Sequence, residues 1–320
     1  MHVITPEPKT ESAAVAKSKG PAVVSVLSGK GGVGKTVFSA NLAVALAEQI
    51  RGVLLIDCDL SAGQAHLVLG LYPPYGLAQV LRGERTLAQI LVRAGDGFLL
   101  VPGGPSGGSA VELKGKEVRR LAAEARLAVP SAQAILFDVG AGRAAAASDF
   151  AAVADVLIVL TTPEPTAIRA TIALIEAMLS ERPEAEPRLV INMVSNEQEA
   201  RAAYTKIVGA LLPVFSNEPG YLGYVPYDLE ISRSLWRYRP VFTYAPRSRA
   251  AGAFRVLRSA LAAQLGMGMG SSVQSSAEGS ESDGAEKARA DREIRGSGFC
   301  DGSDEPGWDD EDDGGEVRAA

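Results

Sequence analysis

Short runs of apolar residues alternate along the chain with longer segments in which apolar residues recur every three or four positions. The short runs are typical of strands buried on both faces of a sheet, and the longer segments are typical of helices packed on it. The strands predicted in this way are 23–27, 53–57, 97–101, 134–138, 155–160, 189–193 and 221–225. Their alternation with helices predicts an α/β fold in which a mostly parallel sheet carries helices on both faces.

The helical segments separate these strands. The longer predicted helices are 37–49, 110–126, 196–212 and 250–265, and one more carries apolar residues from Ile168 to Leu179 at helical spacing. Shorter helical pieces are predicted at 77–81, 87–91 and 231–237, and a short helix or loop at 61–69. All of these elements fall between residues 22 and 265, which we therefore expect to form one domain.

The two ends of the chain have a different composition. Residues 1–21 mix Pro, Lys, Glu, Ser and Ala without periodicity, which predicts a flexible segment. Residues 266–320 are rich in Gly, Ser and acidic residues, which predicts a disordered acidic tail. Residues 271–320 contain 15 acidic and 5 basic residues, a net charge of −10, so the remainder of a chain with net charge −6 carries +4.

Two cysteines, Cys58 and Cys300, are too few for a disulfide framework or a cysteine-rich metal site. The first residues lack the apolar core of a secretory signal, and no run of about 20 apolar residues occurs. These features predict a cytoplasmic protein.

The run Ser28-Gly29-Lys30-Gly31-Gly32-Val33-Gly34-Lys35-Thr36 follows the first predicted strand and precedes the first long helix. It matches the phosphate-binding pattern G-x-x-x-x-G-K-[ST] in the strand–loop–helix context that the pattern requires. Glycines allow backbone N–H groups to point at phosphate oxygens, and the helix directs its positive end toward the same anion. Lys35 brings a cation to the phosphates, and the hydroxyl of Thr36 is a ligand for Mg²⁺.

Acidic residues end two other predicted strands. Asp57 and Asp59 lie at the C-terminal end of the run 53–57, where alternation along a strand directs both carboxylates to one side. Asp138 closes the run 134–138 and is followed by Val139-Gly140-Ala141-Gly142, the Walker B pattern. Carboxylates beside a phosphate loop suit Mg²⁺ coordination and the orientation of an attacking water. The alternative for Asp57 or Asp59 is that it caps the next helix.

Lys30 adds a second lysine to the loop, and the resulting K-G-G-x-G-K-T sequence resembles the deviant loop of the MinD/ParA family of ATPases. The resemblance covers residues 21–265. It includes Leu55-Ile56-Asp57-Cys58-Asp59, Asp138-Val139-Gly140-Ala141-Gly142, Thr162-Pro163-Glu164-Pro165-Thr166 and Tyr221-Leu222-Gly223-Tyr224-Val225-Pro226. The chain is most similar to the MinD-like FlhG branch (FleN or YlxH), which regulates flagellar number and placement.

The resemblance implies a P-loop NTPase fold and an ATP- and Mg²⁺-dependent hydrolase that works as a slow dimeric switch. Two subunits would form a homodimer around two ATP molecules, with Lys30 reaching the partner's nucleotide. Asp59 would orient the hydrolytic water, and Thr36, Asp57 and Asp138 would hold the metal. The implied nucleotide-binding residues are Gly29, Lys30, Gly31, Gly32, Val33, Gly34, Lys35 and Thr36 of the loop, with Asn192 at the adenine edge and Pro226 and Tyr227 packing the base.

Several interpretations stay open at this point. An ATP-driven switch that positions a cellular structure, through a protein partner that the sequence does not name, competes with a ParA-like partition ATPase that binds DNA nonspecifically. The second hypothesis relies on the arginines Arg233, Arg237, Arg239, Arg247, Arg249, Arg255 and Arg258. The apolar face of the last helix either completes the core or binds a membrane peripherally. Residues 1–21 lack the D-Q-A-x-x-L motif with which FlhG proteins stimulate a GTPase partner.

Overall fold

The computed structural model describes residues 20–50, 52–60, 63–104, 113–141 and 144–266. The chain divides into two units, Met1–Gly270 and Ser271–Ala320, and all described residues belong to the first. The predicted flexible segment, except for its last two residues, and the predicted tail beyond Gly266 therefore lie outside the described residues.

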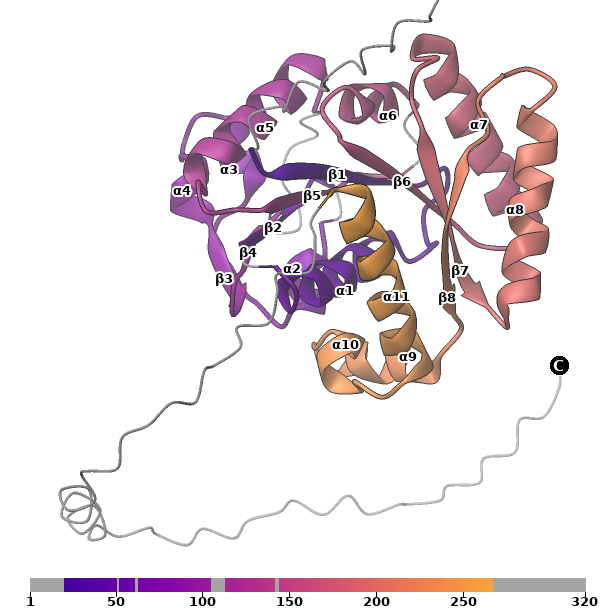
Figure 1. Ribbon diagram of the computed structural model, residues 1–320. Helices are drawn as coiled ribbons and strands as arrows, with labels where there is room; N and C mark the ends of the chain where they lie inside the picture. The colour runs from indigo at the N-terminus through magenta and orange to yellow at the C-terminus, as the bar shows by residue number, and fades with distance from the viewer. Residues whose placement is uncertain (1–19, 51, 61–62, 105–112, 142–143, 267–320) are drawn as a thin grey trace, which may run out of the picture. The chain divides into compact units, whose positions relative to one another are not determined.

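The described residues form an eight-stranded sheet in the order β3-β4-β2-β5-β1-β6-β7-β8 (Figure 1). Neighbouring strands run parallel from β4 to β8, and only β3 is antiparallel, to β4. The strands are β1 (Ala22–Leu27), β2 (Val53–Asp57), β3 (Val92–Gly95), β4 (Phe98–Val101), β5 (Ala134–Asp138), β6 (Val156–Thr161), β7 (Pro187–Val194) and β8 (Gly220–Pro226). The α/β class and the mostly parallel sheet predicted from the sequence are confirmed.

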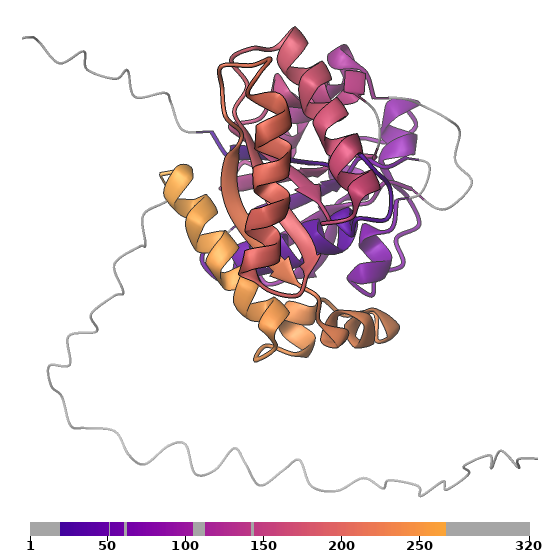
Figure 2. The same cartoon turned by 90° about the vertical axis from the view of Figure 1, so that its right-hand side faces the viewer.

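Helices cover both faces of the sheet (Figures 1 and 2). One apolar cluster joins the sheet to α3 (Leu77–Leu81), α4 (Leu87–Ile90), α5 (Gly115–Ala128), α6 (Ala144–Ala151), α7 (Pro165–Glu181) and α8 (Glu197–Leu211). The second joins the opposite face to α1 (Lys35–Ala47), α2 (Ala65–Val68), α9 (Leu229–Trp236), α10 (Val241–Tyr244) and α11 (Arg249–Gln264). Alternate residues of the buried strands belong to alternate clusters, so the strands are apolar on both sides as their sequences predicted.

The central strand β1 lies between β5 and β6, at the point where the chain's connections change direction across the sheet. Ligands of open α/β sheets bind outside the carboxyl ends of the strands at such a switch point. The phosphate loop leaves β1 at this edge, and β2 and β5 end there in Asp57 and Asp138.

The structure differs from the predicted elements at β3, α6, α10 and the start of α5. Strand β3 was not predicted, because four residues with alternate exposure and no apolar run give little signal. Since β3 pairs antiparallel with β4, the sheet is not wholly parallel. Helices α6 and α10 were also missed, because α6 follows the loop glycines directly and α10 spans only four residues. Helix α5 begins at Gly115 rather than near 110, and residues 105–112 lie outside the described residues.

The last helix, α11, is a core element. Its residues Phe254, Leu257 and Leu261 are buried, and Phe254 packs against Phe38 of α1 with ring centroids 5.7 Å apart. The apolar face that a membrane would need is therefore covered by α1 and β8. None of the helices in the described ranges combines the length and the apolar character that a membrane-spanning segment requires.

Candidate functional site

The loop between β1 and α1 depends on its glycines for two different reasons. A side chain at Gly29 would lie 2.7 Å from the backbone nitrogen of Thr171 and closer still to the carbonyl of Ala170, so only glycine fits against α7. Gly32 and Gly34 have φ of 82° and 85°, in the left-handed region that other residues rarely adopt. Helix α1 begins directly after Gly34, so its N-terminal N–H groups open toward the loop.

Lys35 and Asp138 form a buried ion pair beneath this loop. The Lys35 Nζ lies 2.7 Å from Asp138 Oδ1, and the two side chains are 7% and 0% exposed. Ser39, which lies one turn after Lys35 on α1, donates its hydroxyl hydrogen to the same oxygen at 2.9 Å. Asp138 Oδ2 is buried and has no hydrogen-bond partner among the described residues. The carboxylate is thus hydrogen-bonded at one oxygen and buried without a described partner at the other.

Asp57 lies beside Asp138 in the register of β2 and β5, and it is fully buried. Its two oxygens accept the backbone N–H groups of Asp59 at 3.1 Å and of Ala65, the first residue of α2, at 3.0 Å. Burial and the Asp138 carboxylate raise the pKa of Asp57 to about 7, against the opposing effect of these N–H groups and of Lys35. Asp57 therefore accepts the first N–H group of the next helix, whose N-cap position is Gln64. It also lies next to Asp138.

The third predicted acid, Asp59, follows β2 at the same edge. Its carboxylate lies 3.9 Å from the position that a side chain at Gly140 would occupy. Because Gly140 follows the Walker B strand, Asp59 lies beside the residues expected to approach the terminal phosphate. Thr36 stands in the first turn of α1, next to Lys35. The structure thus brings the predicted acids and the phosphate loop to one edge of the sheet.

These residues fit a magnesium ion bound together with nucleotide phosphates. Within the described ranges no group of three or more His, Cys, Asp and Glu residues forms a cage for a metal. Mg²⁺ keeps several waters and uses one or two carboxylates together with substrate phosphates, so such a cage is not required. The unpartnered Asp138 Oδ2 and the hydroxyl of Thr36, which belongs to the first turn of α1, are oxygen groups of the kind that this mode of binding needs.

Lys30 is placed differently from Lys35. Its Nζ lies 2.8 Å from Glu164 Oε2 and 3.0 Å from Thr166 Oγ1, at the start of α7. The side chains of Lys30 and Glu164 are 41% and 61% exposed. One lysine of the loop is therefore buried beside the Walker B acid, and the other is held at the surface.

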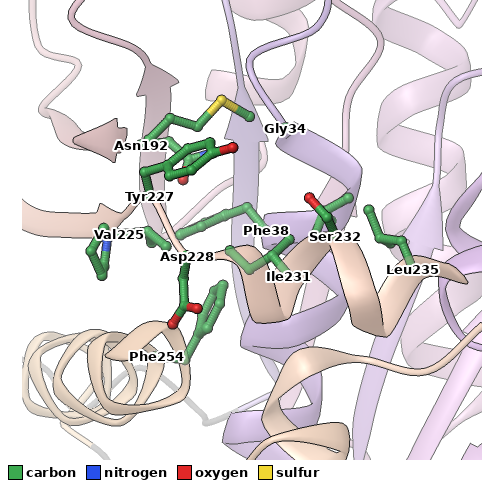
Figure 3. A pocket seen from close by; sticks show the side chains of 13 residues that line it. Gly34, Phe38, Asn192, Val225, Tyr227, Asp228, Ile231, Ser232, Leu235 and Phe254 are labelled. Carbon is green, nitrogen blue, oxygen red and sulfur yellow. The ribbon is translucent and has the colours of Figure 1, made fainter. Parts of the chain in front are cut away.

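A pocket lies beside the loop, between the end of β8 and helices α1, α9 and α11 (Figure 3). Its volume is about 140 Å³, and its lining is mostly apolar, with Phe38, Val225 and Leu235 among the residues. The predicted residues Asn192, Pro226 and Tyr227 all line it. Asn192 donates its amide hydrogen to the carbonyl of Val33 at 2.8 Å, which ties the pocket to the phosphate loop. An apolar slot with one amide suits a purine base.

The structure adds residues to the pocket that sequence reasoning missed. Ile231, Ser232 and Leu235 come from one face of α9, and Phe254 comes from α11. Asp228 holds these two helices together, because its oxygens accept the N–H groups of Glu230 and Ala250, both at 3.0 Å. An Asp just before a predicted helix is a capping signal, which could have identified this role for α9. Nothing local in the sequence indicates the second bond, to α11.

Comparisons with known proteins agree with this geometry. The model of the CobQ/CobB/MinD/ParA nucleotide binding domain matches residues 24–241. The antiactivator FleN of Pseudomonas aeruginosa is 32% identical over 238 residues, which cover 73% of this chain and 84% of FleN. The flagellum site-determining protein YlxH of Helicobacter pylori is 31% identical over 216 residues, which cover 67% of this chain and 71% of YlxH. The chain is thus similar to FleN and YlxH over most of its predicted ATPase domain.

Solved structures with the same fold include cell-division proteins. The MinC:MinD cell division protein complex of Aquifex aeolicus matches with a TM-score of 0.62 and 25% identity, covering 76% of this chain and 96% of that one. The septum site-determining protein MinD of Pyrococcus horikoshii, complexed with Mg-ADP, matches with a TM-score of 0.62 and 24% identity, covering 77% and 98%. With its phosphate loop, Walker B acid and these matches, the chain belongs to the MinD/ParA family of nucleotide-binding ATPases.

Proposed function

We propose that this ATPase is a switch: it binds ATP with Mg²⁺, forms a homodimer around two nucleotides, and hydrolyses ATP slowly to end that state. In this state it would position or count a cellular structure through a protein partner. The name of the similar flagellum site-determining protein YlxH supports the positioning role. The output is binding of the partner, and hydrolysis sets the lifetime of the bound state.

The separation of the two loop lysines is the observation that carries this proposal. Lys35 is buried next to Asp138, inside its own site, whereas Lys30 is 41% exposed and contacts Glu164 and Thr166 at the start of α7. An exposed pair of this kind contributes about 0–1 kcal/mol, so little free energy opposes the release of Lys30 toward a second subunit. A cation supplied in trans would stabilise negative charge that develops on the transferred phosphate.

The chain's own residues would share the chemistry as follows. Lys35 would leave Asp138 for the phosphates, and the loop N–H groups would hold their oxygens. Asp59 would accept a hydrogen bond from the attacking water and so orient it. Asp57, Asp138 and Thr36 would hold the ion and its waters. When bound, Mg²⁺ supplies positive charge to the phosphate oxygens.

Size measurement tests this proposal. We expect a monomer with ADP and a dimer with ATP, and we expect Asp59→Ala to trap the dimer because hydrolysis is lost. Lys35→Ala should abolish ATP binding. Lys30→Ala should bind ATP in the monomer but neither dimerise nor hydrolyse. Normal hydrolysis by Lys30→Ala would refute the dimeric mechanism.

The second candidate function is nonspecific binding of DNA in the ATP state. Residues 229–249 contain five arginines and one acid, Glu230, a net charge of +4. Some arginines of the predicted stripe are engaged within the protein, since Arg233 pairs with Glu230 and Arg258 pairs with Glu48. Retention of duplex DNA that needs ATP and disappears at high salt would favour this function. Absence of retention at low salt would exclude it.

A further inference from the structure

We propose that Ser39 is a positioning residue for the metal site: its hydroxyl fixes the Asp138 carboxylate so that Oδ2 stays directed at the ion's water shell. The inference deepens the proposed function and rests on it. It assigns a role to a serine that lies outside the phosphate-loop motif and outside the set of residues expected to touch nucleotide or metal.

The geometry around Asp138 carries the inference. Lys35 and Ser39 are four residues apart on α1, so the helix presents both side chains on one face, toward the end of β5. Both donate to the same oxygen, Oδ1, at 2.7 Å and 2.9 Å. Ser39 and Asp138 are each 0% exposed. The other oxygen, Oδ2, is buried and lacks a hydrogen-bond partner in the described part of the chain.

The two donors differ in what happens when nucleotide binds. Lys35 must leave Asp138 to reach the phosphates, and after that Ser39 alone holds Oδ1. A carboxylate without this bond would be free to rotate about its Cβ–Cγ bond and exchange its two oxygens. The serine hydroxyl would therefore keep the carboxylate in one orientation through the change of partner, and the unpartnered Oδ2 would be the oxygen that accepts from a metal-bound water.

The experiment compares Ser39→Ala with a matched control, Ser25→Ala. Ser25 is also a buried serine, 0% exposed, but its hydroxyl donates to the backbone carbonyl of Phe150 at 3.3 Å on the face of α6. The affinity for a fluorescent ADP analogue is measured with Mg²⁺ and with EDTA, so the readout is binding and not turnover. Thermal unfolding of each variant in EDTA reports on any general loss of structure.

We expect Mg²⁺ to tighten binding by the wild type and by Ser25→Ala equally. Ser39→Ala should lose about tenfold of that gain, the scale of one hydrogen bond to a charged group, while its affinity in EDTA stays unchanged. In Ser39→Cys the thiol is a weak donor, so the tightening of ADP-analogue binding by Mg²⁺ should lie between that of the wild type and that of Ser39→Ala. A Mg²⁺ gain in Ser39→Ala equal to that of the wild type would overturn the inference alone. No Mg²⁺ gain in the wild type would overturn both the inference and the proposed magnesium site.

Discussion

Gly29 is the position of the phosphate loop where adding one methyl group should most reduce both stability and nucleotide binding. In Gly29→Ala the new Cβ would lie 2.7 Å from Thr171 N, at least 0.7 Å inside an ordinary contact of 3.4 Å, and nearer still to the Ala170 carbonyl. All of these atoms are backbone atoms of α7, so no side chain can rotate away. Overpacking of this kind costs about 1–3 kcal/mol, and we expect the upper end because the loop or the helix must move.

The movement should also weaken nucleotide binding, because the loop N–H groups are aligned by the same backbone. A displacement near 1 Å at a reacting centre can cost on the order of 100-fold in rate, and we expect a loss of about that size in the rate of ATP hydrolysis together with weaker ATP binding. Urea denaturation measures the stability change. With a slope of about 3 kcal/mol per molar for a domain of this size, the midpoint should fall by about 1 M.

Gly31→Ala is the matched control. Gly31 belongs to the same loop, but nothing lies within 4 Å of its hypothetical Cβ, and its φ is outside the left-handed region. We expect a stability change within about 0.5 kcal/mol for this variant. If both variants bind ATP like the wild type, or if both lose the same amount of stability, the argument from close packing against α7 is refuted.

Three further changes test other parts of the site. Glu164→Gln removes the charge that holds Lys30. Because that ion pair is exposed, its loss should raise ATP-dependent dimerisation, measured by sizing, by no more than about fivefold. A larger rise would mean that the ion pair strongly opposes dimerisation, contrary to its exposure. Asn192→Ala removes the hydrogen bond to the loop and the pocket's amide, and should weaken ATP binding about tenfold in a fluorescence titration; an unchanged affinity would place the base elsewhere. Asp228→Ala leaves two helix N–H groups without their acceptor and should lower the free energy of unfolding by about 2 kcal/mol, which is a fall of about 4–8 °C in Tm by calorimetry. Asp228→Asn should retain part of the lost stability, and a fall below 1 °C in Asp228→Ala would contradict the capping of both helices by Asp228.

The sequence alone determined every strand of the described sheet except β3, the longer helices between them, the phosphate loop and the acids at the ends of strands. These features follow from local patterns: apolar runs, helical periodicity, and glycines and lysines at fixed spacing. The same patterns did not predict β3, because a short edge strand with alternate exposure contains too few apolar residues to be recognised. The predicted elements therefore fix the class of fold and the edge of the sheet at which the site lies.

The partners of the site residues were decided only by the tertiary structure. Lys30 contacts Glu164 across 134 residues of sequence, Ser39 contacts Asp138 across 99, and Asn192 contacts Val33 across 159. Such contacts depend on which strands are neighbours in the sheet and on how α1 and α7 pack on it, and no local pattern encodes either. The sequence therefore identified the groups that carry charge, and the packing of distant elements determined which of them are buried, which are paired and which remain open to a ligand.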